Sequence, residues 1–361
     1  MIPIAKPSIG VEEKKAVQDV LDSGMIAQGQ KVKELEDDFA QYISTRYAIA
    51  ITSGTSALHT TLLASGIKEG DEVITTPFTF TATANSILYC GARPVFADID
   101  ADTFNINPET IEEKITSKTK AVLVVHLFGN PCDMDKIKEV CNKHNLLLIE
   151  DACQAHGAEY KGQKVGSIGD CGVFSFYPTK NMTTGEGGMI TTNNADIDRK
   201  CRIIRDHGQD GRDNQVMLGY NYRMTDISAA IGVEQLKKLE GFIEKRINNA
   251  KMLNEGLKGI EGIIIPKIQA DTRHVFNQYT IRVTDDFKVS RDELIQKLKD
   301  AGIGAFVYYP KPIYKQKYYL DLGYDENLKN TENAAKEVLS MPVHPNVTKE
   351  DVKLIIDTIN K

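Results

Sequence analysis

The stretch that decides the fold is AVLVVHLFGNPCDMDKIKEVCNKHNLLLIED, residues 121–151. It begins with an apolar run, 121–126, and ends with another, 146–151, and both are short and rich in residues that favour strands. Between them, residues 133–145 carry apolar side chains at helical spacing. A strand, a helix and a second strand in this order form a unit whose strands run parallel. This stretch therefore predicts a mostly parallel sheet covered by helices.

Five further runs of the same kind extend the pattern along the first two thirds of the chain. Each is apolar over almost its whole length, which is typical of strands buried on both faces. Ligands of such sheets bind beyond the carboxyl ends of the strands, so the residues directly after each strand are candidates for a site. The seven predicted strands are residues 47–52, 72–76, 94–99, 121–126, 146–151, 172–177 and 188–192.

The last third of the chain predicts a second, smaller unit. A long amphipathic helical pattern at 228–256 leads into it. We expect a large domain over residues 1–240 and a small α+β domain over residues 241–361, with the first ten or so residues packing against the small domain. The elements predicted in the small domain are a strand at 278–283, a helix at 290–303, a strand at 304–310 and a helix from 348.

Composition excludes several classes of protein. The 361 residues carry a net charge of -6, which argues against a surface that coats nucleic acid. No run reaches the roughly 20 apolar residues that span a bilayer, and the first residues lack the apolar segment of a signal peptide. Six cysteines show no paired metal spacing. We therefore expect a cytoplasmic protein with reduced thiols, no metal site, and no membrane or nucleic-acid partner.

An anion site is predicted where the first strand meets a helix, in TSGTSAL, residues 52–58. The free N–H groups at a helix start attract anions, and Gly54 lets a phosphate approach closely. The hydroxyls of Thr55 and Ser56 would add donors. An ordinary helix N-cap is the alternative interpretation, because Ser and Thr are common caps.

An acidic residue ends the strand predicted at 146–151. Asp151 ends the apolar run, and a carboxylate there is costly unless it meets a cation or several donors. A protonated ring nitrogen would be such a cation. Gln154, three residues on, would offer an amide from the same side. The alternative for Asp151 is a cap of the following segment.

A lysine in FSFYPTKNMTTGEGGMI, residues 174–190, completes the pattern. Lys180 follows a strand and precedes a glycine-rich loop, where partial burial and nearby cations would lower its pKa, as a Schiff-base amine requires. Ser175 can donate to a phosphate. Phe80 could stack on a ring, or it could simply be a core residue. A phosphate cradle, a carboxylate and an amine are together what pyridoxal phosphate (PLP) needs from a protein.

These motifs resemble the DegT/DnrJ/EryC1/StrS family of PLP-dependent sugar aminotransferases. The resemblance covers essentially the whole chain and implies an α/β fold like that of aspartate aminotransferase, with a mixed seven-stranded sheet in the large domain. The matching motifs are TSGTSAL (52–58), TPFTFTATAN (76–85), IEDACQAHGA (149–158), GVFSFYPTKNMTTGEGGMI (172–190), RDHGQ (205–209) and GYNYRMTDISAAIG (219–232).

The resemblance implies a role for each matching position. Lys180 would form the Schiff base with the cofactor and carry the proton. Asp151 would pair with the pyridine nitrogen, Gln154 would bond near the ring hydroxyl, and Phe80 would stack on the ring. The implied phosphate ligands are Thr55, Ser56 and Ser175, with Gly54 allowing the approach.

The resemblance also implies an assembly. Asn221 matches an asparagine that reaches the phosphate from the neighbouring subunit, so we expect a homodimer with shared sites. Arg223 is a weaker match to a substrate contact. Cys153 stands where alanine is commoner, and we interpret it as a packing residue. Lys180 is present where relatives that dehydrate carry histidine, which favours transamination.

The predicted function is transfer of an amino group from L-glutamate, which leaves as 2-oxoglutarate, to a keto-sugar nucleotide. The TTGEGG loop is similar to that of relatives acting at C4 of the sugar, so a 4-keto acceptor is favoured and a 3-keto acceptor stays open. Two alternatives remain: a cyclitol aminotransferase, and a regulatory protein that uses the PLP fold without turnover. His126, at the end of a strand, could face the cofactor or be structural.

Overall fold

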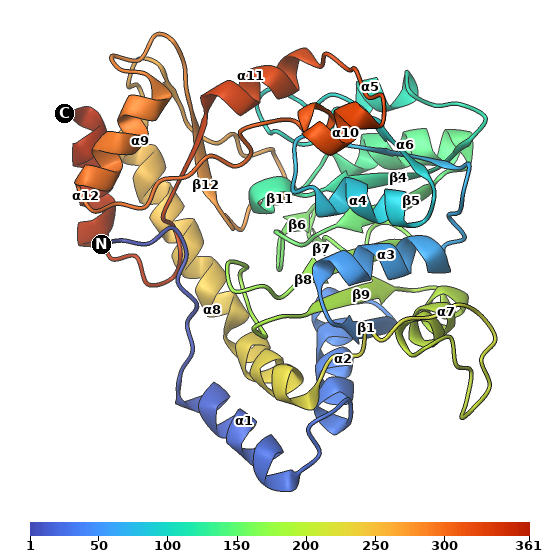
Figure 1. The fold of residues 1–361 in the computed structure, drawn as a ribbon. Coiled ribbons are helices and arrows are strands. Elements are labelled where there is room, and N and C mark those ends of the chain that lie inside the picture. The colour runs from blue at the N-terminus through green and yellow to red at the C-terminus, as the bar shows by residue number, and fades with distance from the viewer.

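The core of the molecule is a seven-stranded sheet (Figure 1). The computed structural model describes all residues, 1–361. The strand order is β1-β9-β8-β5-β4-β2-β3, and these are the seven strands predicted from the sequence. Each observed strand begins and ends within two or three residues of its prediction. The bounds are β1 Tyr47–Ile51, β2 Glu72–Thr75, β3 Arg93–Phe96, β4 Thr119–Val125, β5 Leu147–Asp151, β8 Cys171–Ser175 and β9 Gly188–Thr192.

The strand directions make the sheet mixed. The neighbours β3, β2, β4, β5 and β8 are parallel, whereas β9 runs antiparallel to both β8 and β1. In the register, Asp151 at the end of β5 lies between Val125 of β4 and Val173 of β8. The carboxyl ends of these strands therefore meet at one edge, and the residues that follow them are brought together there.

Helices cover both faces of the sheet, as the apolar strands predict. Along β4, Val122 and Val124 pack in the cluster formed with α2, α6 and α8, whereas Ala121 and Leu123 pack in the cluster formed with α3, α4 and α7. This alternation is the period of two that a strand imposes. The bounds are α2 Gln30–Ile43, α3 Gly54–Ala64, α4 Ala82–Tyr89, α5 Pro108–Glu112, α6 Met134–His144, α7 Ala195–Arg205 and α8 Asp226–Leu257.

A second core forms around a smaller antiparallel sheet of order β10-β12-β13. The strand predicted at 278–283 and the two predicted helices are present in it. β13, which supplies the third strand, was not predicted. The bounds are β10 Ile263–Ile264, β12 Tyr279–Val283, α9 Arg291–Asp300, α11 Lys329–Glu337, β13 Val338–Met341 and α12 Lys349–Asn360.

The prediction of a strand at 304–310 was wrong. Only Phe306 pairs with the sheet, through an isolated bridge to Ser340. Pro310 and Pro312 supply no N–H donors, and the chain leaves the small sheet to cross to the large one, where Ile313 N–H donates to Pro77 O at 3.0 Å. We call residues 304–313 the crossing segment. Beyond it lie η2 Ile313–Lys315 and α10 Lys317–Asp321.

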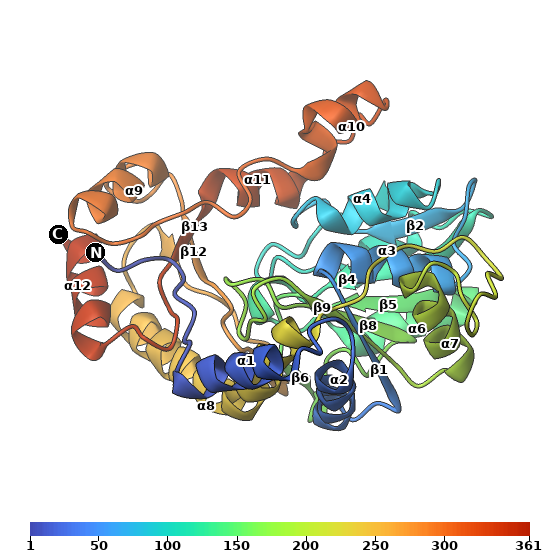
Figure 2. The same cartoon turned by 60° about the horizontal axis from the view of Figure 1, so that its bottom comes forward.

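The long helix α8 joins the two cores (Figure 2). Leu239 and Ile243 pack into the core of the large sheet, and Leu253 and Leu257 pack into the core of the small one. The predicted domain boundary near residue 240 falls inside this helix. The start of the chain lies against the small unit, where Ile2 forms a bridge with Ile303.

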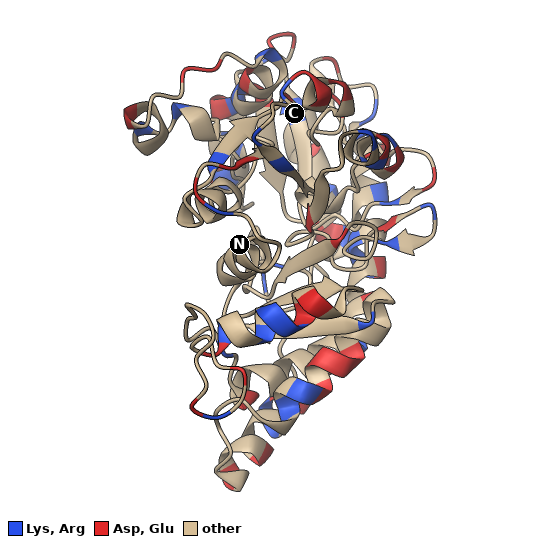
Figure 3. Cartoon of the chain, turned by 90° about the vertical axis from the view of Figure 1, so that its right-hand side faces the viewer, with Lys and Arg blue, Asp and Glu red and all other residues tan.

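Short peripheral elements complete the fold. In Figure 2, α11 and α10 extend from the small unit toward α4, and Tyr319 of α10 donates to Asn85 Oδ1 at 2.7 Å. Figure 3 shows Lys and Arg mixed with Asp and Glu along the helices. None of the helices combines the length and the apolar character that crossing a membrane requires. The remaining elements are α1 Val11–Ser23, η1 Leu127–Gly129, β6 Glu159–Tyr160, β7 Gln163–Lys164 and β11 Thr272–Arg273.

Candidate active site

The start of α3 packs tightly against the end of β8. A Cβ atom added to Gly54 would lie 2.8 Å from Ser175 Cβ and 3.0 Å from Cys153 Sγ. No other residue type fits this position without displacing its neighbours. The register explains the approach, because Gly188 of β9 pairs with both Ile51 and Ser175. Segments 120 residues apart in the sequence therefore form one cradle at the strand ends.

The helix-cap interpretation of residues 52–58 is correct for the backbone. Ser53 is the N-cap of α3 and accepts from Ser56 N–H at 3.1 Å. The Ser56 hydroxyl lies 2.9 Å from Ser53 O, to which it donates. Thr55 has no side-chain partner, and the Ser175 oxygen only accepts from Tyr177 N–H at 3.4 Å. The hydroxyls of Thr55 and Ser175 are thus free to donate to an anion bound at the helix start.

Asp151 is a buried carboxylate that lacks a cation in hydrogen-bond contact. It accepts from the Thr83 hydroxyl at 2.8 Å and from Cys153 N–H at 3.2 Å, and it forms no ion pair. Two neutral donors compensate a buried charge only in part. The site therefore favours a positive group beside Asp151. Thr83 was not predicted as a site residue, although it lies in the 76–85 motif.

The amine of Lys180 also has no ion pair, and burial lowers its pKa, while Cys153 and Asp151 act to raise it. The direction and the contribution of burial are as expected, whereas no nearby cation contributes to the lowered pKa. Asn277 lies two residues before β12 of the small sheet. It donates to Thr179 O and to Asn181 Oδ1, each at 3.2 Å. The small unit therefore holds the loop that carries Lys180, a contact that the sequence did not reveal.

Gln154 is fixed at both ends of its amide. Its Oε1 accepts from Phe128 N–H at 2.9 Å, and its Nε2 donates to the Tyr309 hydroxyl at 3.0 Å. Tyr309 belongs to the crossing segment, 155 residues away in the sequence. It was not among the residues predicted to bind the cofactor, and only the tertiary structure brings it to Gln154.

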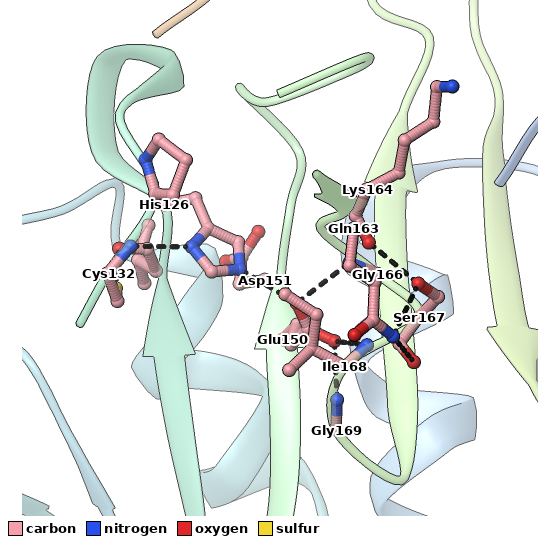
Figure 4. Close-up of polar contacts among 12 residues, drawn as sticks. His126, Cys132, Glu150, Asp151, Gln163, Lys164, Gly166, Ser167, Ile168 and Gly169 are labelled. Atoms are coloured by element: carbon pink, nitrogen blue, oxygen red, sulfur yellow. Dashed lines mark hydrogen bonds and ion pairs between the residues drawn. The ribbon is translucent and has the colours of Figure 1, made fainter. Parts of the chain in front are cut away.

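His126 belongs to a buried structural network (Figure 4). Its Nδ1 accepts from Cys132 N–H at 3.1 Å, so Nε2 carries the hydrogen and donates to Glu150 Oε2 at 3.0 Å. Glu150 also accepts from the backbone N–H groups of Gly166, Ile168 and Gly169, at 2.7 to 2.8 Å. Glu150 and Asp151 are consecutive in β5 and face opposite sides of the sheet. The structural interpretation of His126 is therefore confirmed.

Two of the predicted cofactor residues are exposed in the single chain. Phe80 is 60% exposed, which rules out the alternative that it is a core residue. Asn221 is also exposed, and its backbone bridges to Asp206. Arg223 pairs with Asp206. The contacts of Phe80 and Asn221 with a cofactor remain predictions.

The residues at this edge fit PLP. A close-approach glycine and free hydroxyls lie at a helix start, where a phosphate binds. A carboxylate without a cation lies nearby, suited to a protonated ring nitrogen, together with a lysine of lowered pKa, suited to bond the aldehyde. The charged groups that the chain leaves unpaired are those that this cofactor would pair.

Comparison with known proteins supports the assignment of this site to PLP. The model of the DegT/DnrJ/EryC1/StrS aminotransferase family matches residues 7–360. A GDP-perosamine synthase from Caulobacter vibrioides is 40% identical, with 100% of this chain and 98% of that protein covered. A "Pleiotropic regulatory protein" from Geobacillus stearothermophilus is 42% identical, with 96% and 93% covered.

Solved structures agree as well. The Helicobacter pylori aminotransferase PseC, involved in pseudoaminic acid biosynthesis, superimposes with a TM-score of 0.94 at 31% identity, covering 99% of this chain and 98% of that one. Spr1654 from Streptococcus pneumoniae, in its PLP form, gives 0.94 at 33%, covering 99% and 97%. The protein belongs to the DegT/DnrJ/EryC1/StrS family and is a PLP-dependent aminotransferase.

Proposed function

We propose that this aminotransferase moves the amino group of L-glutamate to a keto group of a nucleotide-linked hexose, with a 4-keto sugar as the favoured acceptor. The observation that carries the proposal is that the buried carboxylate of Asp151 and the half-buried amine of Lys180 lie at one sheet edge and form no ion pair. Two relatives named GDP-perosamine synthase, 40% and 36% identical, support a GDP-linked acceptor.

Each residue contributes one physical effect. Bound PLP would supply an electron sink for the carbon that loses or gains a proton. Lys180 holds an amine whose pKa burial lowers, so that it releases this proton more readily than an exposed lysine would. Asp151 keeps the ring nitrogen protonated through its negative charge. The start of α3, with Thr55 and Ser175, anchors the phosphate.

The proposal includes a homodimer in which Asn221 reaches the phosphate of the partner's site. Its support in the single chain is the exposure of Asn221, next to an apolar loop that is also exposed. In that loop, Leu218 is 79% exposed. Apolar side chains that are exposed together indicate a protein contact.

The test begins with the visible absorption of the purified protein mixed with PLP. L-glutamate should bleach the band, and a GDP-linked 4-keto-6-deoxyhexose should restore it. A keto-inositol that restores the band, where the sugar nucleotide does not, would favour the cyclitol alternative. A protein whose band responds to no amino donor would support the regulatory alternative, for which the name of the Geobacillus relative is the one observation.

A further inference from the structure

The segment that carries Tyr309 is hydrogen-bonded to both units of the molecule. On one side, Phe306 and Ser340 of β13 exchange backbone hydrogen bonds of 3.1 and 2.8 Å. On the other side, Ile313 N–H donates to Pro77 O at 3.0 Å. Phe78 lies edge-on to the Tyr309 ring, with 6.1 Å between the ring centroids. The position of the Tyr309 ring is thus set by both units of the molecule.

The direction of the hydrogen bonds around Gln154 follows from one backbone group. Phe128 N–H can only donate, so the amide atom 2.9 Å from it must be the oxygen. The amide NH₂ then faces Tyr309, whose oxygen accepts at 3.0 Å. The orientation of this amide is therefore determined by chemistry, and the hydroxyl hydrogen of Tyr309 must point elsewhere.

No group of the chain accepts that hydrogen. The bond from Gln154 is the only hydrogen bond of the Tyr309 hydroxyl. The neighbouring carboxylate of Asp151 already accepts from Thr83 and from Cys153 N–H, and it forms no bond to Tyr309. Burial raises the pKa of Tyr309, and the charge of Asp151 acts in the same direction, so the hydroxyl stays protonated at neutral pH. The Tyr309 side chain is half-buried, so a ligand that covers the hydroxyl without accepting its hydrogen would leave a costly unpaired donor.

We propose that Tyr309 donates its hydroxyl hydrogen to an oxygen of the ligand bound beside Asp151 and Gln154. The inference rests on the proposed function. Two ligand oxygens share the required chemistry: the ring oxygen of the cofactor and an oxygen of the sugar substrate. Tyr309 is then a ligand-binding residue, and it couples the small unit to the site.

The test replaces Tyr309 by phenylalanine, which removes one oxygen and keeps the ring. If the acceptor is the cofactor oxygen, Y309F raises the pKa at which the visible band titrates by about one unit, because a donor to that oxygen makes it less basic. If the acceptor belongs to the substrate, the titration is unchanged and KM for the keto-sugar nucleotide rises about tenfold, with KM for L-glutamate unchanged. Unchanged values of all three quantities would overturn the inference.

The matched control is Y279F. Tyr279 is a buried tyrosine of β12 in the small core, and its hydroxyl donates to Asn254 Oδ1 of α8 at 2.7 Å. Y279F also removes a tyrosine hydroxyl that forms one hydrogen bond. We therefore expect a lower melting temperature and no change in the band titration or in either KM. A shift of the same size in Y279F would mean that loss of packing explains Y309F.

A second variant keeps the inference testable if Y309F does not fold. In Q154E the new carboxylate accepts from both Phe128 N–H and the Tyr309 hydroxyl, so the hydrogen is withdrawn from the ligand. We expect the same quantity to move as in Y309F, and the double variant to add nothing to Q154E. If the effects of Y309F and Q154E are equal and add up in the double variant, the proposal is contradicted. Wild-type protein that binds PLP without responding to L-glutamate would instead refute the proposed function.

Discussion

The site depends on single residues that the chain leaves without partners. Lys180 and Asp151 form no ion pair, although Asp151 acts to raise the pKa of Lys180. Glu150, one residue earlier, accepts four hydrogen bonds. The negative charge of Glu150 is therefore compensated by donors of the chain itself. The negative charge of Asp151, the next residue in the same strand, is compensated only in part and can pair with a ligand.

This difference predicts opposite effects of two conservative substitutions on the stability of the protein. D151N should lower activity about 100-fold or more, because the charge that stabilises the ring cation is lost. Its melting temperature without PLP should be equal to or above that of the wild type, because an unpaired buried charge is removed. E150Q should instead lower the free energy of unfolding by about 2–4 kcal/mol, because an amide hydrogen then faces N–H donors. Thermal melting and steady-state kinetics of both variants check this.

Lys180 gives the second prediction at this scale. K180A should abolish the response of the visible band to L-glutamate and reduce turnover at least about 1,000-fold, because proton transfer by a positioned group is lost. The control is K161A, since Lys161 is an exposed lysine paired with Asp135. Turnover above about a tenth of the wild-type rate in K180A would contradict the assignment.

At the scale of elements, α3 and β8 pack too closely for any side chain at Gly54. G54A should destabilise the protein by about 1–3 kcal/mol through overpacking and weaken PLP binding. The comparison is G241A on the exposed side of α8, where a Cβ meets nothing within 4 Å. G241A should stabilise the protein by about 0.5–1 kcal/mol. Urea unfolding and PLP titration measure both, and equal effects of the two variants would refute the packing argument.

The β8 strand also contains a pH-sensitive contact. His156 lies between Phe174 and Phe176, with ring centroids 5.4 and 5.7 Å away, and burial lowers its pKa to about 3. The unfolded chain binds a proton near pH 6.5, so stability should fall as pH drops from about 6.5 toward 3. Neither ring nitrogen has a partner, so H156F should fit. Urea midpoints at pH 7 and pH 5 should then differ less in H156F than in the wild type.

At the scale of the whole molecule, the two units act on one site. The small unit holds the Lys180 loop through Asn277 and reaches Gln154 through Tyr309. A proposed partner subunit adds Asn221. An incomplete site in the single chain would make assembly a condition for activity.

Mixing two inactive variants tests this assembly. If Asn221 serves the partner's site, a mixed dimer of K180A and N221A has one site with both defects and one with neither. An equal mixture, after exchange of subunits, should therefore regain about a quarter of wild-type activity. No recovery would show that Asn221 acts within its own subunit or not at all. Sedimentation of L218D, expected to be monomeric, provides the independent measurement.

The sequence by itself determined the sheet and the chemical character of its edge. Seven apolar strands and their positions follow from local periodicity, because strands buried on both faces carry their pattern in a few consecutive residues. The same is true of Asp151, which ends a strand, and of Lys180, which directly follows a turn. The strand expected at 304–310 failed because local propensity does not show which partner a segment will find.

Only the tertiary structure decided which distant residues complete the site. Thr83 reaches Asp151 across 68 residues, and Tyr309 reaches Gln154 across 155. No periodic pattern in the sequence predicts such hydrogen bonds, because they depend on the register of the sheet and on the path of the crossing segment. The different surroundings of Glu150 and Asp151 are likewise a result of folding, which places three backbone N–H groups on the Glu150 side of β5 and only two neutral donors beside Asp151.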